Sequence, residues 1–379
     1  MARFTLPRDI YHGKDALDAL KTFKGKRAMI CVGGGSMKRF GFLDKVEKNL
    51  KEAGMEVQLF EGIEPDPSVE TVMKGAAAML EFEPDWIVAI GGGSPIDAAK
   101  AMWIKYEYPD ITFEDMCKVF GIPSLRKKAH FCAISSTSGT ATEVTAFSII
   151  TDYQKGIKYP IADFEITPDV AIVDPELAET MPQKLVAHTG MDAMTHAIEA
   201  YVSTANCDFT DPLALHAIKM IQNDLVGSYN GDMEKRDAMH NAQCLAGMAF
   251  SNALLGIVHS MAHPLGALYD TPHGIANAII LPTVMEYNAE ATGEKYRDIA
   301  KAMGVEGTEN MSQEEYRKAA VDAVKQLSKD VGIPTDLKDI VKKEDIPFLA
   351  QSAYDDACRP GNPKETSVED ITKLYESLL

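Results

Sequence analysis

Three of the nine histidines lie close together in one apolar stretch of the chain. They are His259, His263 and His273, within the sequence GIVHSMAHPLGALYDTPHG that begins at Gly256. A second apolar stretch holds Asp192 and His196, which share one face if that stretch is helical, because they are four residues apart. One carboxylate and two or three imidazoles that converge on a point form a site for a divalent transition metal.

An ordinary structural role has to be weighed against this metal site. A single histidine in an apolar helix is more often a core residue with one buried partner than a metal ligand. Three histidines within fifteen positions, together with a separate Asp–His pair, would need several such partners. One shared metal ion satisfies them together, so the spacing favours a metal site. It leaves the metal open, because Fe²⁺, Zn²⁺, Co²⁺ and Ni²⁺ all suit such ligands.

The first half of the chain alternates between strand-like and helical patterns. Short apolar runs at 27–32, 56–60, 85–90, 129–134, 144–151 and 170–173 predict strands, and helical spacing at 38–54, 69–82 and 96–106 predicts helices. This alternation predicts a doubly wound, mostly parallel sheet in an α/β dinucleotide-binding domain over residues 1–180.

After about Met181 the pattern becomes helical only. Ranges 185–202, 213–229, 236–255 and 273–287 have helical periodicity, and no convincing strand follows. We expect an all-helical, metal-binding domain over residues 181–379. The metal candidates all lie in it and the glycine-rich turns all lie before it, so we expect the chemistry in a cleft between the two domains.

Two polar turns follow predicted strands in the first domain. Gly91, Gly92, Gly93, Ser94 and Pro95 open a helix, with Ser94 as the expected N-cap and Asp97 at capping-box spacing. Glycines at a helix start let a phosphate approach the backbone. The second turn, SSTSGT, includes Ser136, Thr137 and Thr140, whose hydroxyls suit a nucleotide. Each turn alone could be an ordinary loop, but open α/β sheets bind ligands at the carboxyl ends of their strands.

A third glycine turn follows the first predicted strand. In dinucleotide folds an acidic residue near such a strand end commonly binds the ribose 2′-hydroxyl. Here Gly34 and Gly35 are followed by Ser36, Lys38 and Arg39 instead. This leaves room and positive charge for a 2′-phosphate, so we expect NADP(H) in preference to NAD(H). The alternative is that both cations belong to the solvated start of a helix.

Composition and charge narrow the class of protein. The net charge is −18 and there is no long basic run, which argues against nucleic acid or an anionic membrane as a partner. No apolar run approaches a membrane span, and the start of the sequence lacks a signal-peptide core. The six cysteines form no CxxC pair, so we expect buried free thiols in a reducing cytoplasm.

The motifs together carry a family resemblance. From about Pro7 to its end, the chain resembles the iron-containing (group III) alcohol dehydrogenases. The motifs that carry this resemblance are TGMDAMTHAIEAY, GIVHSMAHPLG, DTPHGIANAIILP, GGGSPIDAAK and STSGTATEVT. Within that family the likeness is greatest to NADPH-dependent butanol dehydrogenases of anaerobic bacteria. The resemblance implies a dehydroquinate synthase-like fold and a homo-oligomer, a dimer or larger.

The resemblance also assigns residues. It implies that Asp192, His196, His259 and His273 bind one Fe²⁺, with Zn²⁺ as the other possibility. It also implies that His263 is a catalytic residue beside the site, which either relays a proton or holds the substrate or the nicotinamide. It implies dinucleotide contacts from the residues of the three turns and two further positions: Gly34, Gly35, Ser36, Lys38, Gly91, Gly92, Gly93, Ser94, Pro95, Asp97, Ser136, Thr137, Thr140, Ile149 and Lys158.

The implied activity is interconversion of short- to medium-chain primary alcohols and aldehydes, such as butanol and butanal, an oxidoreductase reaction of class EC 1.1.1. A metal ion would act as a Lewis acid on the substrate oxygen while hydride passes to or from the nicotinamide. Two alternatives share the fold, a zinc glycerol or polyol dehydrogenase and a dehydroquinate synthase-like lyase. The four-ligand set argues against both. A phosphorylated acid as substrate would need basic residues in the pocket, but the residues expected there are apolar: Met191, Met194, Phe250, Leu254 and Leu255. The alternative is that these five residues belong only to the helix core.

Overall fold

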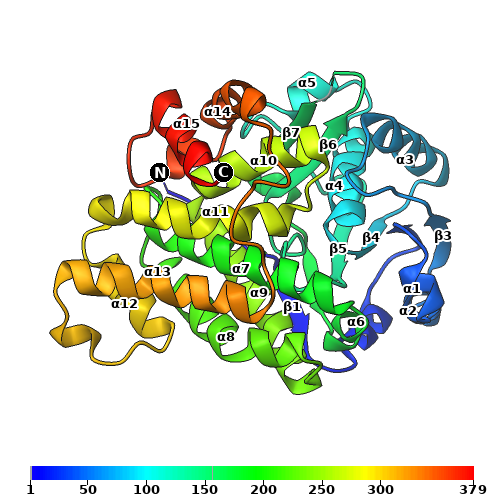
Figure 1. Ribbon diagram of the computed structural model, residues 1–379. Coiled ribbons are helices and arrows are strands. Elements are labelled where there is room, and N and C mark those ends of the chain that lie inside the picture. The colour runs from blue at the N-terminus through cyan, green and yellow to red at the C-terminus, as the bar shows by residue number, and fades with distance from the viewer. Residues whose placement is uncertain (1, 156) are drawn as a thin grey trace. The chain divides into compact units, whose positions relative to one another are not determined.

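The structure is a computed structural model that describes residues 2–155 and 157–379 (Figure 1). It divides into two compact units. One is Thr5–Met181, and the other is Pro182–Leu379 together with the described residues that precede Thr5. Each unit is described by itself.

The first unit is built on a six-stranded sheet. From one edge to the other its strands are β1 (Asp9–His12), β8 (Val170–Val173), β5 (His130–Ser135), β4 (Trp86–Gly91), β2 (Arg27–Val32) and β3 (Glu56–Phe60). Every neighbouring pair is parallel. The expected doubly wound, parallel sheet is therefore confirmed.

The strand order reverses beside β2. The chain passes from β2 to β3 on one side and then returns to place β4 on the other side. Ligands of open α/β sheets bind at such a switch point, outside the carboxyl ends of the strands. The glycine turns that follow Val32 and Ile90 leave the sheet at this point.

Both faces of the sheet are covered, which is why its central strands are apolar throughout. On β2, Met29 and Cys31 belong to one core, and Ala28, Ile30 and Val32 belong to the other. Side chains alternate between faces along a strand, so this division follows directly from the sequence.

Helices and a hairpin complete the first unit. They are η1 (Ala16–Thr22), α1 (Ser36–Arg39), α2 (Phe42–Glu52), α3 (Val69–Phe82), α4 (Gly93–Glu107), α5 (Phe113–Met116), the antiparallel pair β6 (Phe147–Asp152) and β7 (Ile157–Ala162), η2 (Phe164–Ile166) and α6 (Pro175–Glu179). The helix expected over 38–54 is two helices, because the chain turns at Gly41 with φ +81°. The strand expected over 144–151 begins only at Phe147.

The second unit is all-helical over its described residues, as expected. Its elements are α7 (Gln183–Val202), α8 (Asp211–Tyr229), α9 (Met233–Ala253), α10 (Ile257–Tyr269), α11 (His273–Asn288), η3 (Ala289–Thr292), α12 (Lys295–Ala302), η4 (Thr308–Asn310), α13 (Gln313–Asp330), η5 (Lys343–Asp345), α14 (Ile346–Asp355), η6 (Arg359–Gly361) and α15 (Val368–Ser377). Helix α7 packs against α8, α9 and α11, and α10 packs against α11 and α14 (Figure 1).

Two further expectations concern membranes and cysteines. Within residues 2–155 and 157–379 no single helix has the length and apolar composition to cross a membrane, and α9 with α10 passes that test only as a pair bent by 104°. All six cysteines are free. Cys31, Cys132 and Cys244 are buried as expected, but Cys207 is exposed because it lies in the turn before α8.

Candidate metal centre and nucleotide loops

Three imidazoles surround one carboxylate oxygen in the helical unit. The Nε2 atoms of His196, His259 and His273 lie 4.0, 3.8 and 3.7 Å from Oδ1 of Asp192. Around an ion held tetrahedrally by bonds of about 2.1 Å, ligand atoms are roughly 3.4 Å apart. The observed spacing needs only a small contraction to reach that value, so this donor set fits a divalent transition metal.

Burial makes this cluster unusual. Asp192, His196 and His259 have side chains at most 5% exposed, whereas His273 is 40% exposed. Ionisable side chains are rarely buried together unless they share a partner. The three buried residues form a candidate metal site by the distances between their ligand atoms alone.

The first two candidate ligands come from α7. Asp192 and His196 are one turn apart and share a face of this helix, as their spacing predicted. The ring of His196 stacks on the ring of His259 from α10, with centroids 4.7 Å apart. Two helices therefore hold the imidazoles face to face.

A second carboxylate on α7 supports His259 from behind. Oε2 of Glu199 lies 2.6 Å from Nδ1 of His259, and Oε1 accepts a hydrogen bond of 2.8 Å from the backbone N–H of Val258. Glu199 is buried, and burial raises the pKa of its carboxyl to about 8. The pKa of His259 is well below its usual value, because of its own burial and the neighbouring imidazoles. His259 is accordingly a neutral imidazole, the form that binds metals.

An asparagine from α11 closes the cluster. Nδ2 of Asn277 donates to Oδ1 of Asp192 at 2.7 Å and lies 3.1 and 3.0 Å from Nε2 of His259 and His273. Asn277 is one turn after His273, so both point from the start of α11 toward α7.

His263 lies next to the cluster on α10. Its ring stacks on that of His273 at 5.4 Å, and its Nδ1 lies 2.8 Å from Oδ2 of Asp356. Asp356 also accepts from the hydroxyl of Ser260 and the N–H of Cys358. Burial alone would raise the pKa of Asp356, but His263 and these hydrogen bonds outweigh it and lower the pKa to about 2.

Apolar side chains border the imidazoles. Phe250 stacks on His196 at 4.3 Å, and Met191 and Met194 are fully buried on α7. Leu255 is nearly buried, whereas Leu254 is 37% exposed and has a positive φ of +67° at the end of α9. The two methionines are therefore buried in the helical core, and Phe250 contacts a candidate ligand directly.

The two polar turns of the first unit meet each other. The N–H of Ser136 donates to the carbonyl of Gly91 at 2.8 Å. A Cβ atom added at Gly92 would lie 3.3 Å from Thr137, and one added at Gly93 would lie 3.3 Å from Thr140. Gly91 has a φ of +142°, which favours glycine, and a Cβ there would lie 2.6 Å from Pro95. The Oγ1 atom of Thr137 is buried without a hydrogen-bond partner among the described residues. A ligand in the glycine turn would supply that partner.

The predicted capping of α4 is wrong. The N-cap is Gly92, and no side chain caps the helix. Ser94 instead accepts a hydrogen bond from the N–H of Asp66 at 3.3 Å, and Asp97 accepts one from the N–H of Ile149 at 3.1 Å. Asp66 also pairs with Lys158 at 2.8 Å. Asp66 thus links Ser94 on α4 to Lys158 on β7, and Asp97 links α4 to Ile149 on β6. All four of Ser94, Asp97, Ile149 and Lys158 are among the cofactor contacts predicted from the sequence.

A buried lysine fixes the second polar turn. Lys100 is fully buried and donates to the carbonyls of Thr142, Thr145 and Phe147 at 2.8, 2.7 and 3.0 Å. Burial lowers the pKa of Lys100 to about 8 and raises that of its neighbour Asp97 to about 7. With three acceptors the ammonium stays charged at neutral pH, and it holds the segment before β6 against α4.

The third glycine turn presents its cations to solvent. Lys38 is 67% exposed and lies 3.6 Å from Glu61 at the end of β3. Cβ atoms added at Gly34 and Gly35 would meet nothing within 4 Å, so neither glycine is required by packing. The turn therefore has space for a ligand beside one cation.

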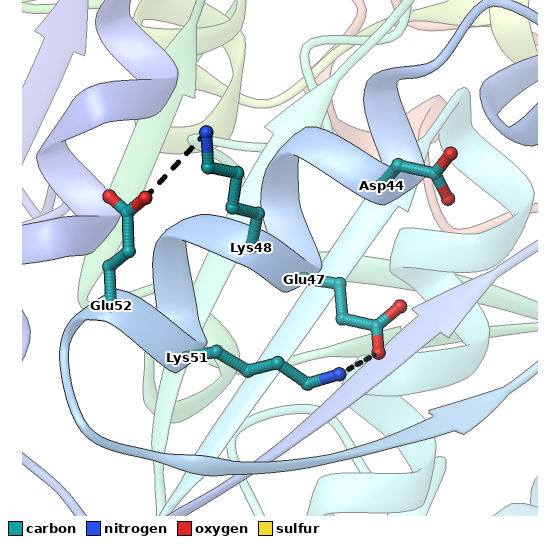
Figure 2. A pocket seen from close by; sticks show the side chains of 5 residues that line it. All are labelled: Asp44, Glu47, Lys48, Lys51 and Glu52. Atoms are coloured by element: carbon teal, nitrogen blue, oxygen red, sulfur yellow. Dashed lines mark hydrogen bonds and ion pairs between the residues drawn. The ribbon is translucent and has the colours of Figure 1, made fainter.

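A shallow hollow on α2 is a different kind of feature. Asp44, Glu47, Lys48, Lys51 and Glu52 line it (Figure 2). Lys51 pairs with Glu47 at 2.5 Å and Lys48 with Glu52 at 3.7 Å, both one turn apart (Figure 2). Exposed pairs of this kind are typical of a solvated helix face and carry no chemistry.

Sequence reasoning missed Glu199, Asn277 and Asp356. A carboxylate at position 199 lies seven residues after Asp192 and so on the same helix face, and Asn277 follows His273 by one turn. Helical spacing could have found both. Asp356 is 93 residues from His263, and nothing in the sequence links them.

Two family models cover almost the whole chain. Residues 7–175 match the iron-containing alcohol dehydrogenases, and residues 186–379 match the C-terminal model of the Fe-containing alcohol dehydrogenase family. The chain belongs to the iron-containing alcohol dehydrogenase family, and it is an oxidoreductase that interconverts alcohols and aldehydes. This membership favours the alcohol dehydrogenase interpretation over the polyol dehydrogenase and lyase alternatives.

Individual relatives agree with the family. The chain is 60% identical over 381 residues to an NADPH-dependent butanol dehydrogenase of Clostridium saccharobutylicum, covering 99% of this chain and 97% of the relative. It is 44% identical over 380 residues to a lactaldehyde reductase of Escherichia coli (strain K12), covering 99% of each. A solved 1,3-propanediol oxidoreductase superposes with a TM-score of 0.94 at 36% identity and full coverage of both chains.

Proposed function

We propose that this chain is an NADP(H)-dependent reductase of short- to medium-chain aldehydes, butanal among them, with Asp192, His196, His259 and His273 as ligands of one Fe²⁺. The observation that carries the proposal is the convergence of three imidazole Nε2 atoms on one oxygen of Asp192, at 3.7–4.0 Å. The relative of 60% identity is an NADPH-dependent butanol dehydrogenase.

The ligand set gives the reaction its electrophile. A divalent ion held by these four residues supplies Lewis-acid polarisation of the carbonyl oxygen. The buried, neutral His259 and the apolar face of Phe250 exclude water and accept an alkyl chain more readily than a charged one. Both features support a simple aldehyde as the substrate.

The polar turns of the first unit are the proposed nucleotide site. Gly91–Ser94 and Thr137 lie at the strand ends beside the switch point of the sheet, and Thr137 has a buried hydroxyl in need of a partner. Six further residues complete the proposed site, either as hydrogen-bond donors or by fixing the conformation of the turns: Pro95, Asp97, Ser136, Thr140, Ile149 and Lys158. Gly34, Gly35, Ser36 and Lys38 are the proposed 2′-phosphate contacts. A 2′-phosphate would replace Glu61 as the partner of Lys38, in a stronger charge-assisted pair.

We assign the proton transfer to His263. Its Nδ1 is hydrogen-bonded to Asp356, so the proton delivered to the product oxygen leaves from Nε2. A nicotinamide cofactor held by the polar turns would supply the hydride to the carbonyl carbon, and the proton from Nε2 of His263 would complete the alcohol. We further propose a homo-oligomer in the cytoplasm, which suits the six free cysteines.

The test is a comparison of cofactors in metal-loaded enzyme. Protein prepared anaerobically and loaded with Fe²⁺ should reduce butanal with a kcat/KM at least about tenfold higher for NADPH than for NADH, the loss expected when one charge-assisted contact is missing. A preference for NADH would keep the enzyme class and reject the role of Gly34–Lys38. No turnover with either cofactor, in protein shown to hold its metal, would reject the aldehyde substrate.

A further inference from the structure

We infer that Glu199 is a positioning residue of the metal site, whose carboxylate fixes the tautomer and the orientation of His259. The inference rests on the proposed function, because it takes His259 as a ligand. It adds a residue that neither the family resemblance nor the spacing of the histidines assigned.

Both carboxylate oxygens of Glu199 form hydrogen bonds with neighbouring residues at the start of α10. Oε2 lies 2.6 Å from Nδ1 of His259, and Oε1 accepts from the N–H of Val258 at 2.8 Å. Imidazole and carboxylate are both buried, with side chains 2% and 5% exposed. Burial favours the neutral form of Glu199, but a cation bound beside His259 would favour the ionised carboxylate. A carboxylate that accepts from Nδ1–H places the lone pair of the neutral ring on Nε2. That atom is the one 3.8 Å from Asp192.

The carboxylate belongs to the same helix face as two proposed ligands. Asp192, His196 and Glu199 follow one another at four and three residues along α7. One rigid helix therefore presents two ligands directly and orients a third, which comes from α10. Metal-binding histidines commonly donate their other N–H to a carboxylate that sets the ring orientation and raises its basicity.

A plain structural role would look different. A side chain that only capped the start of α10 would need one oxygen, the one that accepts from Val258. The second oxygen is committed to the imidazole at a shorter distance. Glutamine at this position keeps the shape but has one acceptor atom, so it cannot accept from both Val258 and His259. With its amide N–H₂ toward Nδ1, it would move the imidazole proton to Nε2 and block ligation.

The experiment measures metal affinity without turnover. Apo-protein is titrated anaerobically with Co²⁺ against a competing chelator, and the dissociation constant and the Co²⁺ absorption spectrum are recorded. For Glu199→Gln we expect about a 10- to 100-fold weaker affinity, the range found for partners of metal ligands, and an altered spectrum in the residual complex.

A matched control separates orientation from general damage. Tyr375→Phe removes a buried hydrogen bond of 2.6 Å onto Met261 in the same helix α10, and leaves Glu199 and His259 in place. Its Co²⁺ affinity should stay within about threefold of the wild type, since it makes no contact with the ligand set. Unfolding temperatures of the apo-proteins show whether the two variants lose comparable stability.

Three results would overturn the inference. The first is wild-type Co²⁺ affinity and spectrum in Glu199→Gln. The second is an equal loss of affinity in Tyr375→Phe. If Glu199→Gln does not fold, Glu199→Asp is tested in its place, because it keeps the charge but draws it away from Nδ1 by one methylene. The third result that would overturn the inference is wild-type Co²⁺ affinity in Glu199→Asp. Failure of the wild-type protein to bind Co²⁺ at all would instead reject the proposed metal site.

Discussion

The backbone carbonyl of His188 on α7 occupies the space where a side chain at Gly274 would begin. A Cβ atom at Gly274 would lie 2.2 Å from that oxygen, and backbone cannot move aside cheaply. Gly274 is the residue after His273, so this close contact sets how near the start of α11 approaches α7. The proposed ligand His273 depends on that approach to reach Asp192.

Gly274→Ala should therefore damage the metal site and the fold together. We expect a loss of roughly 1–3 kcal/mol in the free energy of unfolding, the usual range for overpacking, and weaker metal binding because His273 moves away from Asp192. Urea denaturation and Co²⁺ titration measure the two effects. Gly34→Ala is the control, since a Cβ at Gly34 meets nothing within 4 Å. Wild-type stability in Gly274→Ala would show that α11 can shift without cost.

Loss of one proposed ligand should leave nucleotide binding intact. His259→Ala removes a buried Nε2 donor, and we expect metal affinity to fall by about a hundredfold or more, beyond the loss seen for partners of ligands. NADPH affinity should change by no more than about twofold, because the proposed nucleotide residues belong to the other compact unit. Metal analysis after dialysis and a fluorescence titration with NADPH check both. Simultaneous loss of the two affinities would show that the two sites depend on each other.

Cofactor choice should respond to a single surface charge. Lys38→Ala should lower kcat/KM for NADPH by about ten- to a hundredfold and leave the value for NADH nearly unchanged, because a charge-assisted contact to a phosphate is worth roughly 1.5–3 kcal/mol. Lys48→Ala is the control: this lysine is also exposed and paired with a glutamate, Glu52, one turn away (Figure 2). Equal effects of the two substitutions would reduce the role of Lys38 to general surface charge.

The buried Lys100 should be essential to the second polar turn. Lys100→Met removes the donor shared by the carbonyls of Thr142, Thr145 and Phe147, and leaves them buried without it. We expect a loss of about 3–5 kcal/mol in the free energy of unfolding, the usual cost of breaking a buried charged network. NADPH affinity should fall as well, because Thr140 and Thr142 lie against the glycine turn. Denaturation and NADPH titration test the two parts, and a stable variant with unchanged affinity would contradict both.

Acid should weaken the His263–Asp356 pair in a defined range. The pKa of Asp356 is about 2 in the folded protein against an ordinary value of 3.8, so the folded state favours the charged form. This contribution, roughly 2 kcal/mol, is fully present above about pH 4 and is lost as the pH falls toward 2. Asp356→Asn should therefore be less stable than the wild type at pH 6, and the difference should shrink below pH 4. Urea denaturation at several pH values measures it, and a constant difference would rule out the titration of Asp356 as its cause.

The sequence predicted the elements better than the contacts between them. Continuous apolar runs located β2 and β4 because both faces of the sheet are covered, and the four-residue spacing of Asp192 and His196 placed both on one face of α7. The capping of α4 was wrong because Ser94 and Asp97 bond to the distant backbone of Asp66 and Ile149. Such partners depend on tertiary packing, which local spacing does not encode. The same holds for Asp356, which reaches His263 across 93 residues.

No disulfide cross-links the helices that carry the proposed ligands, α7, α10 and α11, because all six cysteines of the chain are free. An ion shared by Asp192, His196, His259 and His273 would join these helices as a disulfide joins the segments of a secreted domain. Binding to the folded state alone would then stabilise the helical unit by mass action. A chelator should act on this protein as a reductant acts on a disulfide-bonded one, and amide hydrogens of α7 and α10 should exchange faster once the ion is gone.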